Sequence, residues 1–176
     1  MAKILDNDRQ LNPDRSPVIG VMGGSLCDEE EEQLAFQTGR EIAYRGAILL
    51  TGGMGGVMEA ASRGAKENMG FVIAVLPGKN ARSSPPNPYV DLPVYTGLAE
   101  GRNLVNVLTS DVIIAIGGGW GTLSEIALAR RVQKEVIMLK SWNISHKKFP
   151  VDGIFEVQSA KEAVEEAFAR IKGFKI

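Results

Sequence analysis

The chain has 176 residues, 44% hydrophobic and 23% charged, which is the composition of one ordinary globular domain. Its 20 basic and 21 acidic residues leave a formal net charge of −1, which argues against a protein that grips long nucleic acid. One cysteine, Cys27, and one histidine, His146, exclude an internal disulfide and a Cys/His zinc cluster, so we expect no metal site. No signal segment and no run of about 18 apolar residues occurs, so we expect a cytoplasmic protein without membrane contact.

The chain order indicates one folded domain preceded by a short arm. Residues 1–15 are polar with few apolar partners, which predicts a flexible N-terminal arm, and residues 16–176 are expected to form a single domain. Short apolar runs then alternate with segments of helical periodicity. The runs predict strands at residues 18–22, 47–51, 71–76, 90–96, 111–116 and 135–140, with a possible seventh at 154–157. The helical patterns cover residues 28–45, 57–68, 98–109, a stretch after 121 that ends near 133, and 160–172.

Alternation of strands and helices predicts a parallel sheet with helices on both faces. The fold class is therefore α/β, a Rossmann-like doubly wound sheet of about seven strands. Asp28 is placed to cap the first helix, and Gly46 is placed to end it.

Two glycine-rich turns follow strands, at residues 52–56 and 117–121. Glycines fill four of the five positions from 117 to 121, and a helix begins directly afterwards. Such a turn lets a ligand approach the backbone, and free amides at a helix N-terminus attract anions, so we predict a bound phosphate. A tight turn without a ligand is the alternative, and the repetition of the pattern at 52–56 makes it the less favoured one.

Ligands of such sheets bind at the carboxyl ends of the strands, near the point where the strand order reverses. The candidate residues for phosphate or nucleotide binding on that edge are Gly24, Ser25, Gly52, Gly53, Gly55, Gly56, Gly118, Gly119, Gly121 and Thr122. Arg102 and Glu125 are the catalytic candidates, because an arginine can bind a phosphate and a carboxylate can oppose positive charge on a sugar ring. A purely structural ion pair between them is an equal alternative. Asp111 precedes its strand, which predicts a cap or ion pair on the opposite edge.

Several features of the sequence exclude ligands or leave alternatives open. The first turn lacks Gly-x-Gly-x-x-Gly, and no Gly-x-x-x-x-Gly-Lys-Ser/Thr occurs, so NAD and nucleoside triphosphates are disfavoured and a mononucleotide remains.

The loop at residues 77–88 is either a lid, with Lys79 and Arg82 meeting phosphate, or a plain connection. For Trp120 we favour packing or subunit contact over base stacking.

The segment at residues 117–125, GGGWGTLSE, resembles the motif Pro-Gly-Gly-x-Gly-Thr-x-x-Glu of the LOG-like (SLOG) Rossmann family. The best-known members are the Lonely Guy phosphoribohydrolases, often mislabelled lysine decarboxylases. Residues 52–58 match the earlier glycine motif of the family, and Arg102 matches its catalytic arginine. Gly117 stands where proline is usual, and residues 99–103 read AEGRN where the enzymes have Met-His-x-Arg-Lys. The amino-acid sequences of both glycine motifs are more similar to those of the molybdenum cofactor carrier proteins, another branch of the family.

The resemblance implies a small phosphorylated ligand and two competing functions. The leading hypothesis is a hydrolase that splits the N-glycosidic bond of nucleoside 5′-monophosphates, with Arg102 orienting the ribose phosphate and Glu125 acting on the sugar and water. The alternative is a non-catalytic carrier or sensor of a phosphorylated ligand such as the molybdenum cofactor, a phosphorylated pterin. DNA binding is a third possibility that the net charge disfavours. The family also implies a homodimer or homotetramer, and no resident cofactor is expected.

Overall fold

The computed structural model describes residues 15–148 and 151–171, so the predicted arm lies, apart from Arg15, outside the described residues. Within those ranges the chain forms one seven-stranded sheet whose pairings are all parallel. The strands are β1 (Val18–Gly23), β2 (Ile48–Thr51), β3 (Val72–Leu76), β4 (Leu92–Tyr95), β5 (Val112–Ile116), β6 (Val136–Leu139) and β7 (Ile154–Val157). The helices are α1 (Glu29–Tyr44), α2 (Val57–Glu67), η1 (Ala99–Gly101), α3 (Arg102–Thr109), α4 (Trp120–Arg131) and α5 (Ala160–Arg170).

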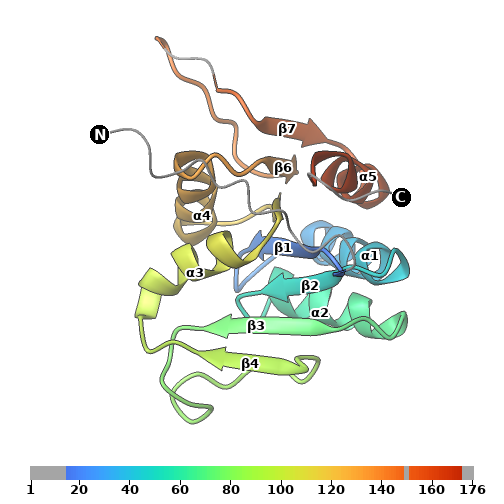
Figure 1. The fold of residues 1–176 in the computed structure, drawn as a ribbon, viewed down its shortest axis with the longest axis vertical. Coiled ribbons are helices and arrows are strands. Elements are labelled where there is room, and N and C mark those ends of the chain that lie inside the picture. Colours follow the sequence, from blue (N-terminus) through green and yellow to red (C-terminus); the bar gives the residue numbers. More distant parts are fainter. Residues whose placement is uncertain (1–14, 149–150, 172–176) are drawn as a thin grey trace.

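The helices form a layer on each face of the sheet (Figure 1). Helices α1, α2 and α5 pack on one face, where the larger hydrophobic core lies. Helices α3 and α4 pack against each other on the opposite face, over a second core. All five residues of β5 are buried, as expected for a strand covered on both faces. The arrangement confirms the predicted doubly wound α/β fold.

The strand order is β4-β3-β2-β1-β5-β6-β7, so the sheet grows in opposite directions from β1. The register of β1 pairs Ile19 with Leu49 of β2 on one side and with Val112 of β5 on the other. The carboxyl ends of β1, β2 and β5 are therefore neighbours at the reversal point. The two glycine-rich turns and the first strand-to-helix turn meet there.

The predicted caps of the first helix are present. The Asp28 carboxylate accepts a hydrogen bond from the Glu31 amide at 2.8 Å, and the Glu31 side chain accepts one from the Asp28 amide at 3.3 Å. This reciprocal pair is a capping box, and the Glu31 amide is the main cause of the lowered pKa of Asp28. After the helix, Gly46 has a φ of 75°, the left-handed conformation that suits glycine.

Helices α1 and α2 approach so closely that their backbones touch. A Cβ atom at Gly39 would lie 1.9 Å from the Ala61 carbonyl oxygen, and one at Gly64 would lie 1.9 Å from the Phe36 carbonyl oxygen. Both positions therefore require glycine.

Two predicted boundaries are corrected. Strand β4 is shorter than the predicted 90–96 and follows Asp91, whose carboxylate accepts the Val72 amide at 2.8 Å. The predicted helix at 98–109 begins with the 3-10 turn η1, because Gly97 and Ala99 have positive φ angles of 65° and 48° that no α-helix contains. On the opposite edge, Asp111 accepts the Val18 amide at 2.8 Å and pairs with Arg15, as predicted.

None of the helices in the described part of the chain is long and apolar enough to cross a membrane.

Candidate functional site

The turn between β5 and α4 presents a row of unused backbone amides. Gly119 precedes the helix, no side chain caps its N-terminus, and the first helical bond runs from the Leu123 amide to the Gly119 carbonyl at 3.1 Å. The amides of residues 118–122 donate no hydrogen bond to any residue that the structure describes. A Cβ atom at Gly119 or Gly121 would meet nothing within 4 Å, so this side of the turn is open. Open amides at a helix N-terminus can receive an oxyanion.

The turn is fastened to the neighbouring strand end. The Gly117 amide donates to the Lys140 carbonyl at 3.1 Å, and the Ser141 hydroxyl donates to the Gly117 carbonyl at 2.7 Å. Gly117 and Gly118 have φ angles of 50° and 96°. A proline ring fixes φ near −65°, so the residue at 117 could not be proline in this conformation. The positive φ therefore explains why this chain has glycine where the usual motif has proline.

Arg102 and Glu125 come together, although 23 positions separate them in sequence. Arg102 is the first residue of α3 and Glu125 lies in α4; the Arg102 Nη1 atom is 3.7 Å from Glu125 Oε1. Both side chains are buried. Burial lowers the pKa of Arg102 and raises the pKa of Glu125, and the attraction between the two charges opposes both shifts. The predicted proximity is confirmed, and the catalytic roles stay predictions.

Two asparagines of α3 bond to residues of α4 near this pair, and sequence reasoning missed both. The Asn106 side-chain amide donates to Glu125 Oε1 at 2.7 Å, the same oxygen that faces Arg102. The Asn103 amide donates to the Ser124 hydroxyl at 2.8 Å, and Ser124 donates to the Gly121 carbonyl at 2.7 Å. Helix α3 thus holds the start of α4 in place. Asn106 stands four residues after Arg102, which is the spacing of one helix face, and this was the available signal.

The glycine-rich turn at residues 52–56 has closer main-chain neighbours than the turn at residues 117–121. The Val57 amide, the first of α2, donates to the Gly24 carbonyl at 3.0 Å. A Cβ atom at Gly56 would lie 2.4 Å from that same carbonyl oxygen, and one at Gly55 would lie 3.3 Å from the Ser25 carbonyl oxygen. The predicted residues Gly24, Ser25, Gly55 and Gly56 therefore form one contact between two turns. The Gly24 carbonyl therefore already accepts an amide at the N-terminus of α2.

Gly52 and Gly53 have different neighbours. A Cβ atom at Gly52 would lie 2.3 Å from Arg102 Nη1, so glycine here makes room for the guanidinium group. Gly53 has a φ of 74°, and its amide donates to the Thr51 hydroxyl at 3.0 Å. Gly52 thus belongs to the surroundings of Arg102, and Gly53 shapes the turn.

The loop at residues 77–88 contacts the glycine-rich turn at residues 52–56 through Asn87. Its backbone amide donates to the Gly53 carbonyl at 2.8 Å, and its side-chain amide donates to the Met54 carbonyl at 3.1 Å. Lys79 and Arg82 are exposed, and their cationic groups make no ion pair within the described ranges. The lid function stays a prediction.

Trp120 projects from the start of α4 with 79% of its surface exposed. Its ring contacts that of Trp142, with the centroids 5.3 Å apart and the planes tilted by 41°. This contact agrees with the packing role that we favoured and leaves most of the ring uncovered. No group of three or more His, Cys, Asp or Glu residues arranged for a metal ion occurs in the described part of the chain.

Comparisons with known proteins agree with the resemblance. A model of the SLOG cluster4 family matches residues 16–166. The structure of the molybdenum cofactor binding protein from Rippkaea orientalis is 41% identical, with a TM-score of 0.81 over 89% of this chain and 98% of that chain. The molybdenum cofactor carrier protein from Chlamydomonas reinhardtii is 35% identical, with a TM-score of 0.77 over 89% of this chain and 98% of that chain. An uncharacterized protein from Archaeoglobus fulgidus is 44% identical over 122 residues, 69% of this chain and 79% of that protein. The chain belongs to the SLOG cluster4 family.

Proposed function

We propose that this protein binds a small phosphorylated ligand and carries it without chemical change, and that the ligand is a phosphorylated pterin such as the molybdenum cofactor. The observation that carries the proposal is the row of unused amides at residues 118–122, at the start of the helix whose Glu125 faces the buried cation of Arg102. Amides, a helix dipole and an arginine together suit a phosphate group. The similarity to a molybdenum cofactor binding protein and to a molybdenum cofactor carrier protein supports this class of ligand.

The environment of Glu125 favours carriage over hydrolysis. Its Oε1 atom already accepts a hydrogen bond from Asn106 and lies 3.7 Å from Arg102 Nη1. A carboxyl group held in this way is a weaker partner for the positive charge that develops on a sugar ring. The histidine and lysine that accompany the arginine in the enzymes are also absent, since Glu100 and Asn103 stand at their positions.

The binding proposal is tested by substitution at Gly119. Gly119→Val adds a side chain where the turn is open, so the fold should persist while the branched group blocks the amides. We expect the affinity for ribose 5-phosphate, measured by calorimetry, to fall at least about tenfold, the scale of losing one charged hydrogen bond. Ala169→Val, on the exposed face of α5, is the control. Equal affinities for Gly119→Val and the parent would place the phosphate elsewhere.

Hydrolysis of nucleoside 5′-monophosphates is the second candidate function. The observation that favours it is the buried pair at the edge of the turn, with Arg102 Nη1 3.7 Å from Glu125 Oε1. A carrier should release no free base from AMP, GMP, CMP or UMP. Base release by the wild type that falls about a hundredfold or more in Glu125→Gln, with nucleotide binding retained, would overturn the carrier proposal and establish the hydrolase.

We also propose that the protein self-associates through the outer face of α3. Leu104 and Leu108 lie one turn apart on this helix and remain 40% and 58% exposed, and the exposed ring of Trp120 begins the neighbouring helix. Large apolar side chains at helical spacing on a surface are typical of an interface.

A further inference from the structure

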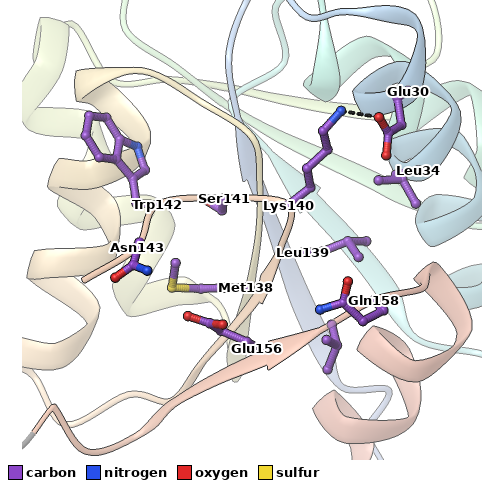
Figure 2. Close-up of a pocket in the computed structure, with 11 residues that line it drawn as sticks. Glu30, Leu34, Met138, Leu139, Lys140, Ser141, Trp142, Asn143, Glu156 and Gln158 are labelled. Atoms are coloured by element: carbon purple, nitrogen blue, oxygen red, sulfur yellow. Dashed lines mark hydrogen bonds and ion pairs between the residues drawn. The ribbon is translucent and has the colours of Figure 1, made fainter. Parts of the chain in front are cut away.

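A hollow of about 270 Å³ lies at the carboxyl ends of β6 and β7 (Figure 2). Leu34 of α1 and Leu139 of β6 provide apolar wall, while Asn143, Glu156 and Gln158 bring polar groups. Ligand pockets for small molecules begin at about 300 Å³, so this hollow can hold a ring system rather than a large ligand.

The hollow lies next to the strand end that holds the turn at residues 117–122, where we propose that phosphate binds. Lys140 and Ser141 line it, and these are the two residues that hold Gly117 through hydrogen bonds of 3.1 and 2.7 Å. Neighbouring strands of a sheet lie about 4.8 Å apart, so β5 and β7 are separated by about 10 Å. A phosphate at the turn and a ring in the hollow can therefore belong to one molecule of the size of a mononucleotide.

Three polar side chains that line the hollow are exposed and available to a ligand. The carboxylate of Glu156 and the side-chain amides of Asn143 and Gln158 make no hydrogen bond or ion pair with any residue in the described ranges. In contrast, the Lys140 ammonium group is committed to Glu30, as Figure 2 shows, and lies 3.5 Å from Asp28. Glu156 pairs with Met138 across the two strands, so both side chains lie on the same face beside the opening. The hollow thus offers a negatively charged double acceptor accompanied by amides.

We propose that this hollow recognises a ring bearing an amino group, a ring N–H and a carbonyl in consecutive positions, the arrangement found in guanine and in pterins. The amino group and the ring N–H are adjacent donors that match the two oxygens of Glu156, and the ring carbonyl accepts from Asn143 or Gln158. Adenine lacks the adjacent pair of donors, so its acceptor nitrogen would face the carboxylate and leave it unpaired. The inference rests on the proposed function, because the phosphate of the same ligand occupies the turn at 118–122.

The test compares three nucleotides that share a ribose phosphate. We expect GMP to bind at least about tenfold more tightly than IMP, which differs by the absence of the amino group, and AMP to bind no better than IMP. Glu156→Gln should reduce the affinity for GMP to that for IMP. Glu67→Gln, on the exposed end of α2, is the matched control and should leave the ratio unchanged.

The turn and the hollow can be tested separately. Ribose 5-phosphate contacts only the turn, so its affinity should be the same in Glu156→Gln as in the parent. Equal binding of GMP, IMP and AMP beside intact ribose 5-phosphate binding would overturn the ring proposal and leave the proposed function standing. Loss of ribose 5-phosphate affinity in Glu156→Gln would also overturn it, because the residue would then act through the fold. Failure of the parent to bind either ribose 5-phosphate or GMP would overturn both.

Trp142 gives an independent readout, because it also lines the hollow. The chain has 2 tryptophans, so Trp120→Phe leaves Trp142 as the sole indole emitter. Addition of GMP to that variant should change the emission, whereas ribose 5-phosphate should not. Unchanged emission at saturating GMP would place the base outside the hollow.

Discussion

Glu125 keeps only 5% of its surface exposed, and its environment pulls its pKa in two directions. Burial raises the pKa, while the hydrogen bond from Asn106 and the charge of Arg102 lower it, and burial is the largest of the three effects. The folded protein therefore holds the Glu125 proton more tightly than the unfolded chain does. Stability depends on pH wherever the two states bind different numbers of protons.

Glu125→Gln removes this titration and keeps an acceptor for Asn106. Because the folded pKa is raised, its contribution to stability is complete below the ordinary value of 4.5 and is lost as pH rises through the folded pKa. We expect the free energy of unfolding of the wild type to fall, relative to that of the variant, as pH rises from 4.5 to neutrality. Urea unfolding of both proteins across this range measures the difference. A stability difference that does not change with pH would show that folding does not raise the pKa of the Glu125 carboxyl group.

At the scale of elements, the contact between α1 and α2 brings two helix backbones together. It is made by backbone against backbone, at Gly39 and Gly64, and it sets the distance between two helices that cover the larger core. The start of α2 also bonds to Gly24, the turn after β1. Helix spacing and turn geometry are therefore linked on this face of the sheet.

Gly39→Ala should destabilise the protein by about 1–3 kcal/mol, the usual scale of overpacking, because the added methyl group would overlap the Ala61 carbonyl. In an exposed helix the same change is favourable by up to about 1 kcal/mol. Gly121→Ala supplies that comparison, since a Cβ atom at Gly121 meets nothing within 4 Å. Denaturant midpoints that shift in opposite directions are expected. A neutral Gly39→Ala would show that the helices can separate without loss.

Element positions follow from periodicity, and some of their ends do not. The buried run of β5 and the cap at Asp28 are visible in the sequence because each depends on neighbouring residues. The shortening of β4 accompanies the hydrogen bond from the Val72 amide to the Asp91 carboxylate. This contact joins residues 19 positions apart, and no local pattern reveals it.

At the scale of the whole molecule, self-association is the property that the exposed face of α3 predicts. Substituting both Leu104 and Leu108 by Glu should place charge in the interface and halve the mass, or reduce it further, in sedimentation equilibrium. Met69→Glu changes a residue that is 92% exposed at the end of α2 and should leave the mass unchanged. A wild type of monomer mass, or a double variant of unaltered mass, would contradict the proposal.

The place of the candidate site in the fold could be inferred from the sequence, because the topology of a doubly wound sheet brings the ends of β1, β2 and β5 together. The meeting of Arg102 with Glu125 followed from that edge alone. The unequal surroundings of the two glycine-rich turns could not be predicted. Each turn has four glycines in five positions, and the turns differ in the nearby Gly24 carbonyl, which accepts the Val57 amide. The hollow beyond β6 was also missed, since Glu156 and Gln158 lie in a strand and turn that carry no motif.

The fastening of Gly117 to Lys140 and Ser141 has a kinetic consequence. A turn that two hydrogen bonds already fix has little conformational freedom left to lose when an anion arrives. Phosphate association then requires no loop rearrangement, so its rate should rise linearly with concentration, and differences in affinity among ligands should reside in their dissociation rates. The residence time of a ligand would accordingly be set by the part that lies beyond the phosphate.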